Sequence, residues 1–433
     1  MTTLYLHNLG CSKNQVDGEA FAGWAALQGI ELIDAAEEAE IIVINTCAFI
    51  DAAKDEAIDA ILAAGQLKET ARCQRLYVCG CFPQRFKEEL QAELPAVDGF
   101  YGVQEWSDLQ NQLKPETTAA ADPLLHRIIG TPGHYAYLRI ADGCNRGCTY
   151  CVIPQIRGKY HSRPPENIIW EAQLLAANGV KELLPVAQEL NSYGHDLNAG
   201  HKNKPLIDLL GRLGQIDGIE WIRPLYLHPP ACDEELLIFW ASQPKLCPYL
   251  DLPIEHASDR MLRAMGRGGS QKQLRQLLET ARSLIPGVVI RTSMIVGFPG
   301  ETDADFEELL SFVAAMEIAR LGSFQYSPED GTPAALLPDQ IPDEVKAERQ
   351  TRLMELQADI SEERCLARVG QVAEVFVDFY EKETGYSIAH SRLELPDLDG
   401  EILIQGELQA GSKLKVRFTS ATEYDLFAEI VDA

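Results

Sequence analysis

The chain has 433 residues, of which 46% are hydrophobic and 24% charged, and its formal net charge is −27. This composition is typical of a globular protein of two or three domains, and no apolar run approaches the roughly 20 residues of a membrane-spanning helix. The N-terminus lacks a basic segment followed by an apolar one, so we expect no secretory signal and a cytoplasmic location. So acidic a chain is a poor nonspecific ligand for nucleic acid and suits a basic partner.

Residues 1–117 are expected to form a doubly wound parallel α/β domain. Short apolar runs at 4–6, 41–44 and 76–78 alternate with helical stretches at 18–27 and 54–64. Continuous apolar strands of this kind are typical of a parallel sheet that helices cover on both faces. A segment rich in Pro, Thr and Ala at 114–132 predicts a linker to the next domain.

Residues 130–361 are expected to form a second domain of six strand-then-helix units. This repeat predicts a partial, open (β/α)6 relative of the eight-fold barrel, with its chemistry at the carboxyl ends of the strands. Pro185 falls inside the second strand, where it removes a ladder donor and predicts a bulge or a frayed end. The strands are predicted near 137–140, 182–187, 220–225, 249–253, 289–296 and 322–326.

Residues 362–433 are expected to form a small antiparallel β-barrel, preceded by a charged helix at 343–364. Apolar residues alternate at period two in several short runs with turn signals between them. The tail holds seven Lys and Arg against fifteen Asp and Glu, a net charge of −8. The segment ELPDLDGE is predicted to be an exposed turn. Its acidic residues Glu394, Asp397 and Asp399 either meet a basic partner or form a solvated acidic loop without one.

Cys144, Cys148 and Cys151 form a C-x3-C-x2-C motif directly after the first barrel strand. This spacing matches neither the two-cluster ferredoxins nor the paired knuckles of zinc ribbons. Three thiolates without a nearby fourth cysteine leave one iron of a 4Fe-4S cluster open, and in radical enzymes that iron chelates S-adenosylmethionine. The alternatives are a zinc site completed by His161 and a set of structural free thiols.

Two further segments are candidates for binding S-adenosylmethionine. Tyr150 and Val152 flank the third cysteine, where an adenine could pack against them. The turn VGFPGET ends the fifth barrel strand, and its backbone could approach the ribose or methionine part of the cofactor, although a plain strand-to-helix connection is the alternative. The residues of this turn that we assign to the cofactor are Gly297, Pro299, Gly300 and Glu301.

These motifs together resemble the methylthiotransferases of the radical S-adenosylmethionine superfamily. The resemblance spans nearly the whole chain: LGCSKN, NTCAFI, VCGC, the central cysteine motif, VGFPGET, YSPEDGTPA and a terminal barrel of the TRAM type. It implies a second 4Fe-4S cluster on three cysteines of the first domain, Cys11, Cys47 and Cys81. Each of these directly follows a separate predicted parallel strand, and ligands of doubly wound sheets bind at that rim.

The five remaining cysteines are not assigned to a cluster. Cys79 lies two residues before Cys81 but inside the predicted strand, so we reject it as a ligand. The others have no partner pattern and are interpreted as ordinary thiols: Cys73, Cys232, Cys247 and Cys365.

Two branches of the family differ in substrate. The MiaB type modifies an adenosine of tRNA, and the RimO type modifies the β-carbon of an aspartate in small-subunit ribosomal protein twelve. LGCSKN, NTCAFI, SRPPENI and HASDRMLRAMGR resemble the second branch. The acidic tail agrees with it, because a barrel that holds RNA should be basic and an acidic one attracts a basic ribosomal protein.

The resemblance implies a reaction with two halves. One S-adenosylmethionine methylates sulfur held at the first-domain cluster, and another is cleaved reductively at the central cluster to give a 5′-deoxyadenosyl radical. An electron donor such as flavodoxin or ferredoxin is implied, and no stable nucleic-acid binding is expected. The alternatives are a tRNA methylthiotransferase and, from another class, a non-enzymatic iron–sulfur electron carrier.

Some positions depart from the family pattern at the ends of barrel strands. The chain has AQELN, with Glu189, where an AQD-type segment is usual, and PIEH, with Glu255 and His256, where PLQH is usual. Together with His228, the last two residues end barrel strands and could contact the substrate, although a lone histidine is more often structural.

Overall fold

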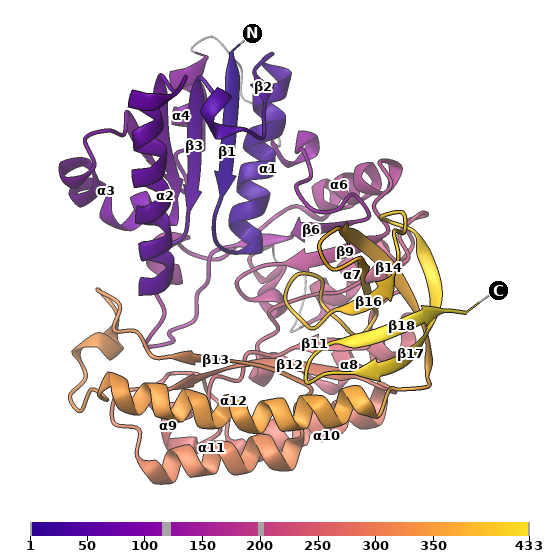
Figure 1. Ribbon diagram of the computed structural model, residues 1–433. Coiled ribbons are helices and arrows are strands. Elements are labelled where there is room, and N and C mark those ends of the chain that lie inside the picture. Colours follow the sequence, from indigo (N-terminus) through magenta and orange to yellow (C-terminus); the bar gives the residue numbers. More distant parts are fainter. Residues whose placement is uncertain (1, 115–122, 198–202, 432–433) are drawn as a thin grey trace.

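The computed structural model describes residues 2–114, 123–197 and 203–431. Its N-terminal region is built around a five-stranded parallel sheet. Its order is β2-β1-β3-β4-β5, and the central strand is buried along its whole length. Helices α1 and α4 cover one face and α2 and α3 the other (Figure 1). The elements are β1 (Thr3–Asn8), α1 (Ser12–Leu27), β2 (Glu31–Leu32), β3 (Ile41–Thr46), α2 (Asp51–Thr70), β4 (Arg75–Gly80), α3 (Cys81–Glu93), β5 (Gly99–Gly102) and α4 (Trp106–Leu113).

The central region contains the six predicted parallel strands, in two sheets of three, β10-β9-β6 and β11-β12-β13. An isolated parallel bridge between Ile222 and Leu246 joins them into one open half-barrel. The strands are β6 (Tyr135–Arg139), β9 (Glu182–Val186), β10 (Trp221–Ile222), β11 (Tyr249–Asp251), β12 (Val289–Val296) and β13 (Arg320–Gln325). The helices between them are α6 (Pro165–Ala177), α7 (Lys204–Gly214), α8 (Glu234–Ser242), α9 (Asp259–Ala264), α10 (Gln271–Leu284) and α11 (Asp303–Met316).

Pro185 is accommodated in β9 without the predicted bulge. It pairs with Leu138 of β6 in an unbroken register. On its other side, β10 pairs only with Glu182 and Leu183. Beyond these pairs the Leu225 N–H still donates to the Pro185 carbonyl at 3.0 Å, so backbone hydrogen bonding continues on that side and the predicted frayed end is absent there as well.

Helix α12 (Asp343–Leu366) leads to a closed five-stranded barrel, as the sequence predicts. One pair, β16 with β18, is parallel, and the other neighbours are antiparallel. The barrel packs beside the central strands (Figure 1), against their amino ends: the ring centroids of Phe376 and Trp221, the first residue of β10, are 4.5 Å apart. Its strands are β14 (Val372–Glu381), β15 (Tyr386–Ser391), β16 (Ile402–Gln405), β17 (Lys413–Ala421) and β18 (Leu426–Ile430).

The prediction that ELPDLDGE is an exposed turn is wrong for two of its three acidic residues. The Glu394 carboxylate is buried and pairs with Arg320 and Arg368. The Tyr249 hydroxyl donates to Asp399 at 2.7 Å, and only Asp397 is exposed. The segment has the local signals of a turn, but arginine and tyrosine side chains from distant segments bury these two carboxylates at the domain contact.

The described parts of the chain include no helix that is both long enough and apolar enough to cross a membrane.

Candidate functional site

Cys11, Cys47 and Cys81, here called the N-terminal triad, follow β1, β3 and β4 at one rim of the first sheet. The fully buried side chain of Asn14 joins the three loops. Its amide group donates to the carbonyl of Thr46 at 2.8 Å, directly before Cys47. Its Oδ1 lies 3.5 Å from the Sγ of Cys81 and 4.0 Å from the Sγ of Cys11.

Two glycines let these loops approach one another. Gly10 has φ +91°, and a Cβ there would lie 2.6 Å from the Cβ of Cys47. Gly80 has φ +99°, and a Cβ there would lie 2.6 Å from the Thr46 carbonyl oxygen. Neither position tolerates a side chain. Cys79 is fully buried inside β4, in the core between the sheet and helices α1 and α4 rather than at the rim.

The N-terminal triad has the donor chemistry of a cluster site. Burial raises the pKa of Cys47, and the nearby Cys11 raises it further. Burial also raises the pKa of Cys81 to about 12, while the guanidinium of Arg157 acts in the opposite direction. Buried thiols become thiolates when they bind metal, so three thiols gathered at one rim fit a group that replaces their protons.

Cys144, Cys148 and Cys151, here called the central triad, lie on the loop between β7 (Ala141–Asp142) and the short α5 (Ile153–Ile156). The Thr149 N–H donates to the Met265 carbonyl at 3.0 Å, which fastens the loop to the end of α9. A Cβ on Gly266, where φ is +67°, would lie 2.7 Å from the Gly147 carbonyl oxygen. The three cysteines are half-buried, so the loop presents its thiols at the rim.

The cysteines of the central triad lie close enough together that, beyond the effect of burial, Cys148 raises the pKa of the Cys144 and Cys151 thiols. Burial raises the pKa of Cys151 to about 12, and Cys148 and Cys144 contribute in the same direction. A guanidinium nitrogen of Arg267 lies 3.6 Å from the Sγ of Cys148. The structure therefore brings together the three cysteines of each triad.

The guanidinium of Arg157 links the two triads, and that of Arg139 pairs with the same two carboxylates, Asp17 and Asp142. Arg157, six residues after Cys151, donates to Asn14 at 2.6 Å and to Asp17 at 2.8 Å, both on α1. It also donates to Asp142 at 3.2 Å, directly before the central loop. Asn14 and Arg157 are functional residues that the sequence analysis above does not predict. The spacing of Asn14 and Asp17 on one helix face after Cys11 was a usable signal, but nothing in the sequence indicated Arg157.

The two residues that flank Cys151 point in different directions. Tyr150 is half-buried and packs against Met261, Met265 and Phe298 on the barrel side. Val152 is fully buried in the core of the N-terminal domain. That burial leaves no exposed surface on Val152 for an adenine, so its predicted contact with the cofactor is at odds with the structure.

The turn after β12 is held by its own glutamate. Glu301 is buried and accepts hydrogen bonds from the N–H groups of Gly297 at 2.8 Å and Phe298 at 3.2 Å. It also pairs with Arg349 of α12 at 2.9 Å. Pro299 is buried as well. The side chain of Glu301 therefore shapes the turn.

The Gly300 N–H donates to the Asp339 carbonyl at 2.8 Å. This backbone donor of the turn is thus already engaged within the protein, as are those of Gly297 and Phe298.

The residues at the ends of barrel strands that the sequence analysis names as possible substrate contacts or as departures from the family pattern differ in burial. Burial lowers the pKa of His228 to about 3, with Arg267 and Arg146 adding to the effect, so its imidazole is neutral. Burial raises the pKa of Glu255, which lies near Tyr150 and Arg267. Glu189 pairs with Arg146 of the central loop. His256 is fully buried, and its Nδ1 accepts from the Ser258 N–H at 2.9 Å, so it has no surface to offer a substrate.

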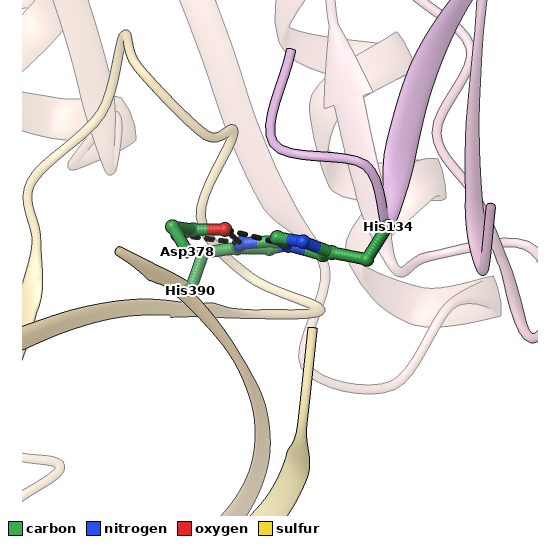
Figure 2. Close-up of side chains that lie close together, drawn as sticks. All are labelled: His134, Asp378 and His390. Atoms are coloured by element: carbon green, nitrogen blue, oxygen red, sulfur yellow. Dashed lines mark hydrogen bonds and ion pairs between the residues drawn. The ribbon is translucent and has the colours of Figure 1, made fainter. Parts of the chain in front are cut away.

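A cluster of His134, Asp378 and His390 has the residue types of a metal site (Figure 2). Both histidines contact Oδ1 of Asp378 at 2.8 Å, and the other nitrogen of His390 contacts Glu182 at 2.7 Å. These are hydrogen-bond distances, whereas ligand atoms around tetrahedral zinc stand about 3.3 Å apart. Burial lowers the pKa of His390, but Glu182 and Asp378 outweigh it and raise the pKa to about 9. The imidazolium of His390 therefore balances the Asp378 carboxylate, and Arg223 balances that of Glu182, so the cluster is an ion-pair network.

The fold and the central loop define the class of protein first. An open parallel half-barrel with three cysteines beyond its first strand is the arrangement of the radical S-adenosylmethionine superfamily, whose profile matches residues 138–313. The TRAM domain profile matches residues 369–431, and a family described as uncharacterized protein family UPF0004 matches residues 3–102.

Relatives along the whole chain identify the family. The chain is 42% identical to "Ribosomal protein uS12 methylthiotransferase RimO" of Trichlorobacter lovleyi, over 98% of this chain and 97% of the relative. It is 43% identical to the protein of the same name from Anaeromyxobacter sp. strain K, over 99% and 93%. The chain belongs to this family of radical S-adenosylmethionine methylthiotransferases, whose cofactors are 4Fe-4S clusters and S-adenosylmethionine.

Solved structures share the fold at low identity. The radical S-adenosylmethionine methyltransferase TsrM of Kitasatospora setae superposes with a TM-score of 0.55 at 14% identity, covering 74% of this chain and 72% of TsrM. The cobalamin-dependent radical enzyme OxsB gives a TM-score of 0.53 at 14% identity, covering 81% of this chain and 56% of OxsB.

Proposed function

We propose that this chain adds a methylthio group to the β-carbon of an aspartate in ribosomal protein uS12. The central triad holds the cluster that binds S-adenosylmethionine, and the N-terminal triad holds the cluster that carries sulfur. The domains are residues 1–117, 130–361 and 362–433. The observation that carries the proposal is the pair of cysteine triads on facing loops, tied together by Asn14 and Arg157.

The bound cofactors supply a methyl group for sulfur and, by reductive cleavage, a 5′-deoxyadenosyl radical that removes hydrogen from carbon. The protein's residues do the positioning. Asn14 fixes the three loops of the N-terminal triad, and Arg157 fixes that domain against the central loop. Tyr150 remains the side chain that could pack against an adenine, and the backbone of the turn from Gly297 to Gly300 lies at the same rim.

The barrel interior is closed at its amino end. Trp221 and Tyr249 of the central strands pack with Phe376 and Leu395 of the TRAM domain. Water and substrate therefore reach the interior from the carboxyl rim, where both triads lie. Exclusion of water around the reacting carbon protects a radical from side reactions.

The substrate assignment rests on the names of the relatives and on charge. A tail of −8 disfavours tRNA and suits a basic ribosomal protein. A flavodoxin or ferredoxin as electron donor, a cytoplasmic location and the absence of stable nucleic-acid binding belong to the same proposal. An electron carrier would need neither the open half-barrel nor a second triad.

Mass spectrometry of small-subunit proteins and of tRNA, from cells with and without this gene product, tests the proposal. We expect a methylthio group on uS12 only when the protein is present, with tRNA unchanged. A methylthio group that appears on tRNA and not on uS12 would reassign the substrate.

A further inference from the structure

Lys13 is a buried cation without an anion. The residue is 5% exposed and lies in the first turn of α1, two residues after Cys11. Across the described parts of the chain, no carboxylate lies within ion-pair distance of its ammonium group and no acceptor receives a hydrogen bond from it. Its Nζ lies over the ring of Tyr226, 3.0 Å from the ring centroid.

This arrangement is costly unless something else binds there. Lysines are almost never buried unless they are paired, and contact with an aromatic ring offsets only part of the lost hydration. The first turn of a helix also favours negative charge, yet that of α1 contains no acidic residue. The hydroxyl of Ser12, in the same turn, is buried and has no partner in the described structure. An anion bound here would pair with the ammonium group, accept a hydrogen bond from the hydroxyl and interact favourably with the first turn of the helix.

The location restricts which anion this can be. Asn14 and Arg157 face the sulfur atoms of the N-terminal triad. Lys13 instead reaches Tyr226, which follows β10 at the carboxyl rim of the half-barrel. Tyr226 is itself held there in a left-handed conformation, φ 63°, by a hydrogen bond from its N–H to Asp251 at 2.9 Å. The ammonium group therefore lies between the N-terminal domain and the rim of the half-barrel.

We propose that the ammonium group of Lys13 binds the side-chain carboxylate of the substrate aspartate. This inference rests on the proposed function, in which the β-carbon of an aspartate is modified. That carbon carries the carboxylate directly, so a cation that holds the carboxylate fixes the reacting carbon to within one bond. Lys13 then selects aspartate over its neutral isostere asparagine, because an ammonium group donates up to three hydrogen bonds and accepts none.

The test is a binding cycle with anaerobically reconstituted protein, S-adenosylmethionine and no reductant. The ligands are uS12 and uS12 with its target aspartate changed to asparagine. Wild type should bind the aspartate form about 10- to 100-fold more tightly, the range expected for a hydrogen-bonded charge pair. Lys13→Met should bind both forms equally, with the affinity that wild type has for the asparagine form, and Lys13→Arg should recover part of the preference. Lys68→Met, which removes a charge that pairs with Asp98 on the surface, should behave as wild type.

Two accompanying measurements separate other sources of a negative charge. Iron content and transfer of a methyl group from S-adenosylmethionine to sulfur, measured as S-adenosylhomocysteine, should be unchanged in Lys13→Met. Loss of iron would assign Lys13 to the cluster, and loss of methyl transfer would assign it to the methionine carboxylate of the cofactor; either overturns the inference. So does a Lys13→Met protein that still prefers aspartate. Failure of wild type to bind either form of uS12 would instead reject the proposed function, and this inference with it.

Discussion

Several buried ionic networks attach the central domain to its neighbours, and two of them lie at opposite ends of the strands. On the N-terminal side, Arg157 joins Asp17 and Asn14 of α1 to Asp142 beside the central triad. On the C-terminal side, His390 and Asp378 of the TRAM domain meet Glu182 at the start of β9. The chemistry is similar, but the first network lies at the carboxyl ends of the strands among the cysteines, and the second at their amino ends.

Because the two networks lie at opposite ends of the strands, they have different roles: one positions the cysteine triads and the other attaches the TRAM domain. A buried ion pair is weak evidence for extra stability, because desolvation offsets its attraction, but removal of one partner is strongly destabilising. The Arg157 network therefore fixes where the two triads stand relative to each other. The His390 network holds the TRAM domain in place and closes the amino end, at a distance from the chemistry.

The largest effect is expected from Arg157→Met. It removes one of the two guanidinium groups that Asp17 and Asp142 share, leaves Arg139 as the other, and releases Asn14. We expect a cost of up to about 3–5 kcal/mol, the range for breaking a buried ion pair. We expect lower thermal stability and loss of iron from the N-terminal triad, measured by unfolding and iron analysis. The matched control is Arg352→Met, which breaks a surface pair with Glu307 worth less than about 1 kcal/mol. Equal stability of the two variants would show that the first network fixes nothing.

A smaller effect is expected at the second network, through pH. The folded-state pKa of His390 is about 9, above its ordinary value of 6.5. The contribution of protonated His390 to the free energy of unfolding is therefore complete below pH 6.5. It is lost as the pH rises through about 9, by up to about 3 kcal/mol. The protection of β15 amides from hydrogen exchange, taken relative to their intrinsic base-catalysed rate, should fall over this pH range in wild type as the TRAM domain loosens. In His390→Gln the same pH dependence should be absent; if it persists, other groups are responsible.

The smallest effect is expected from the exposed acidic residues of the TRAM domain. Neutralising Glu383, Glu407 and Glu423 by glutamine should slow association with uS12 a few-fold at low salt, because such attraction is screened beyond about 10 Å at 0.1 M. Turnover of bound substrate should not change, since this domain lies at the amino ends of the strands. The matched control removes three exposed charges from the N-terminal domain: Asp34→Asn, Glu37→Gln and Glu69→Gln. Equal slowing in both would indicate net charge rather than a docking surface.

The two triads also differ in how far the sequence predicts them. The central triad lies within eight residues, so its spacing alone indicated a cluster. The N-terminal triad spans three strands, and only the family resemblance, supported by strand order, selected Cys81 over Cys79. Val152 was misjudged because proximity in sequence to Cys151 does not determine the side of the loop on which a residue lies.

The networks themselves could not be predicted, because their members come from distant segments. Glu394 and Asp399 follow the local pattern of an exposed acidic turn. Their burial depends on Arg320, Arg368 and Tyr249, which no local pattern connects to them. This third buried cluster, like the Arg157 and His390 networks, is therefore a property of the assembled domains.

The most direct test of the account compares two triple cysteine-to-alanine variants, one for each triad, with anaerobically reconstituted wild type. Wild type should hold about eight irons, four in each cluster, and each variant about four. The central-triad variant should form no 5′-deoxyadenosine, whereas the N-terminal-triad variant should still form it and yet transfer no methylthio group to uS12. Methylthio transfer by the N-terminal-triad variant, or cleavage of S-adenosylmethionine by the central-triad variant, would contradict the division of labour between the two triads.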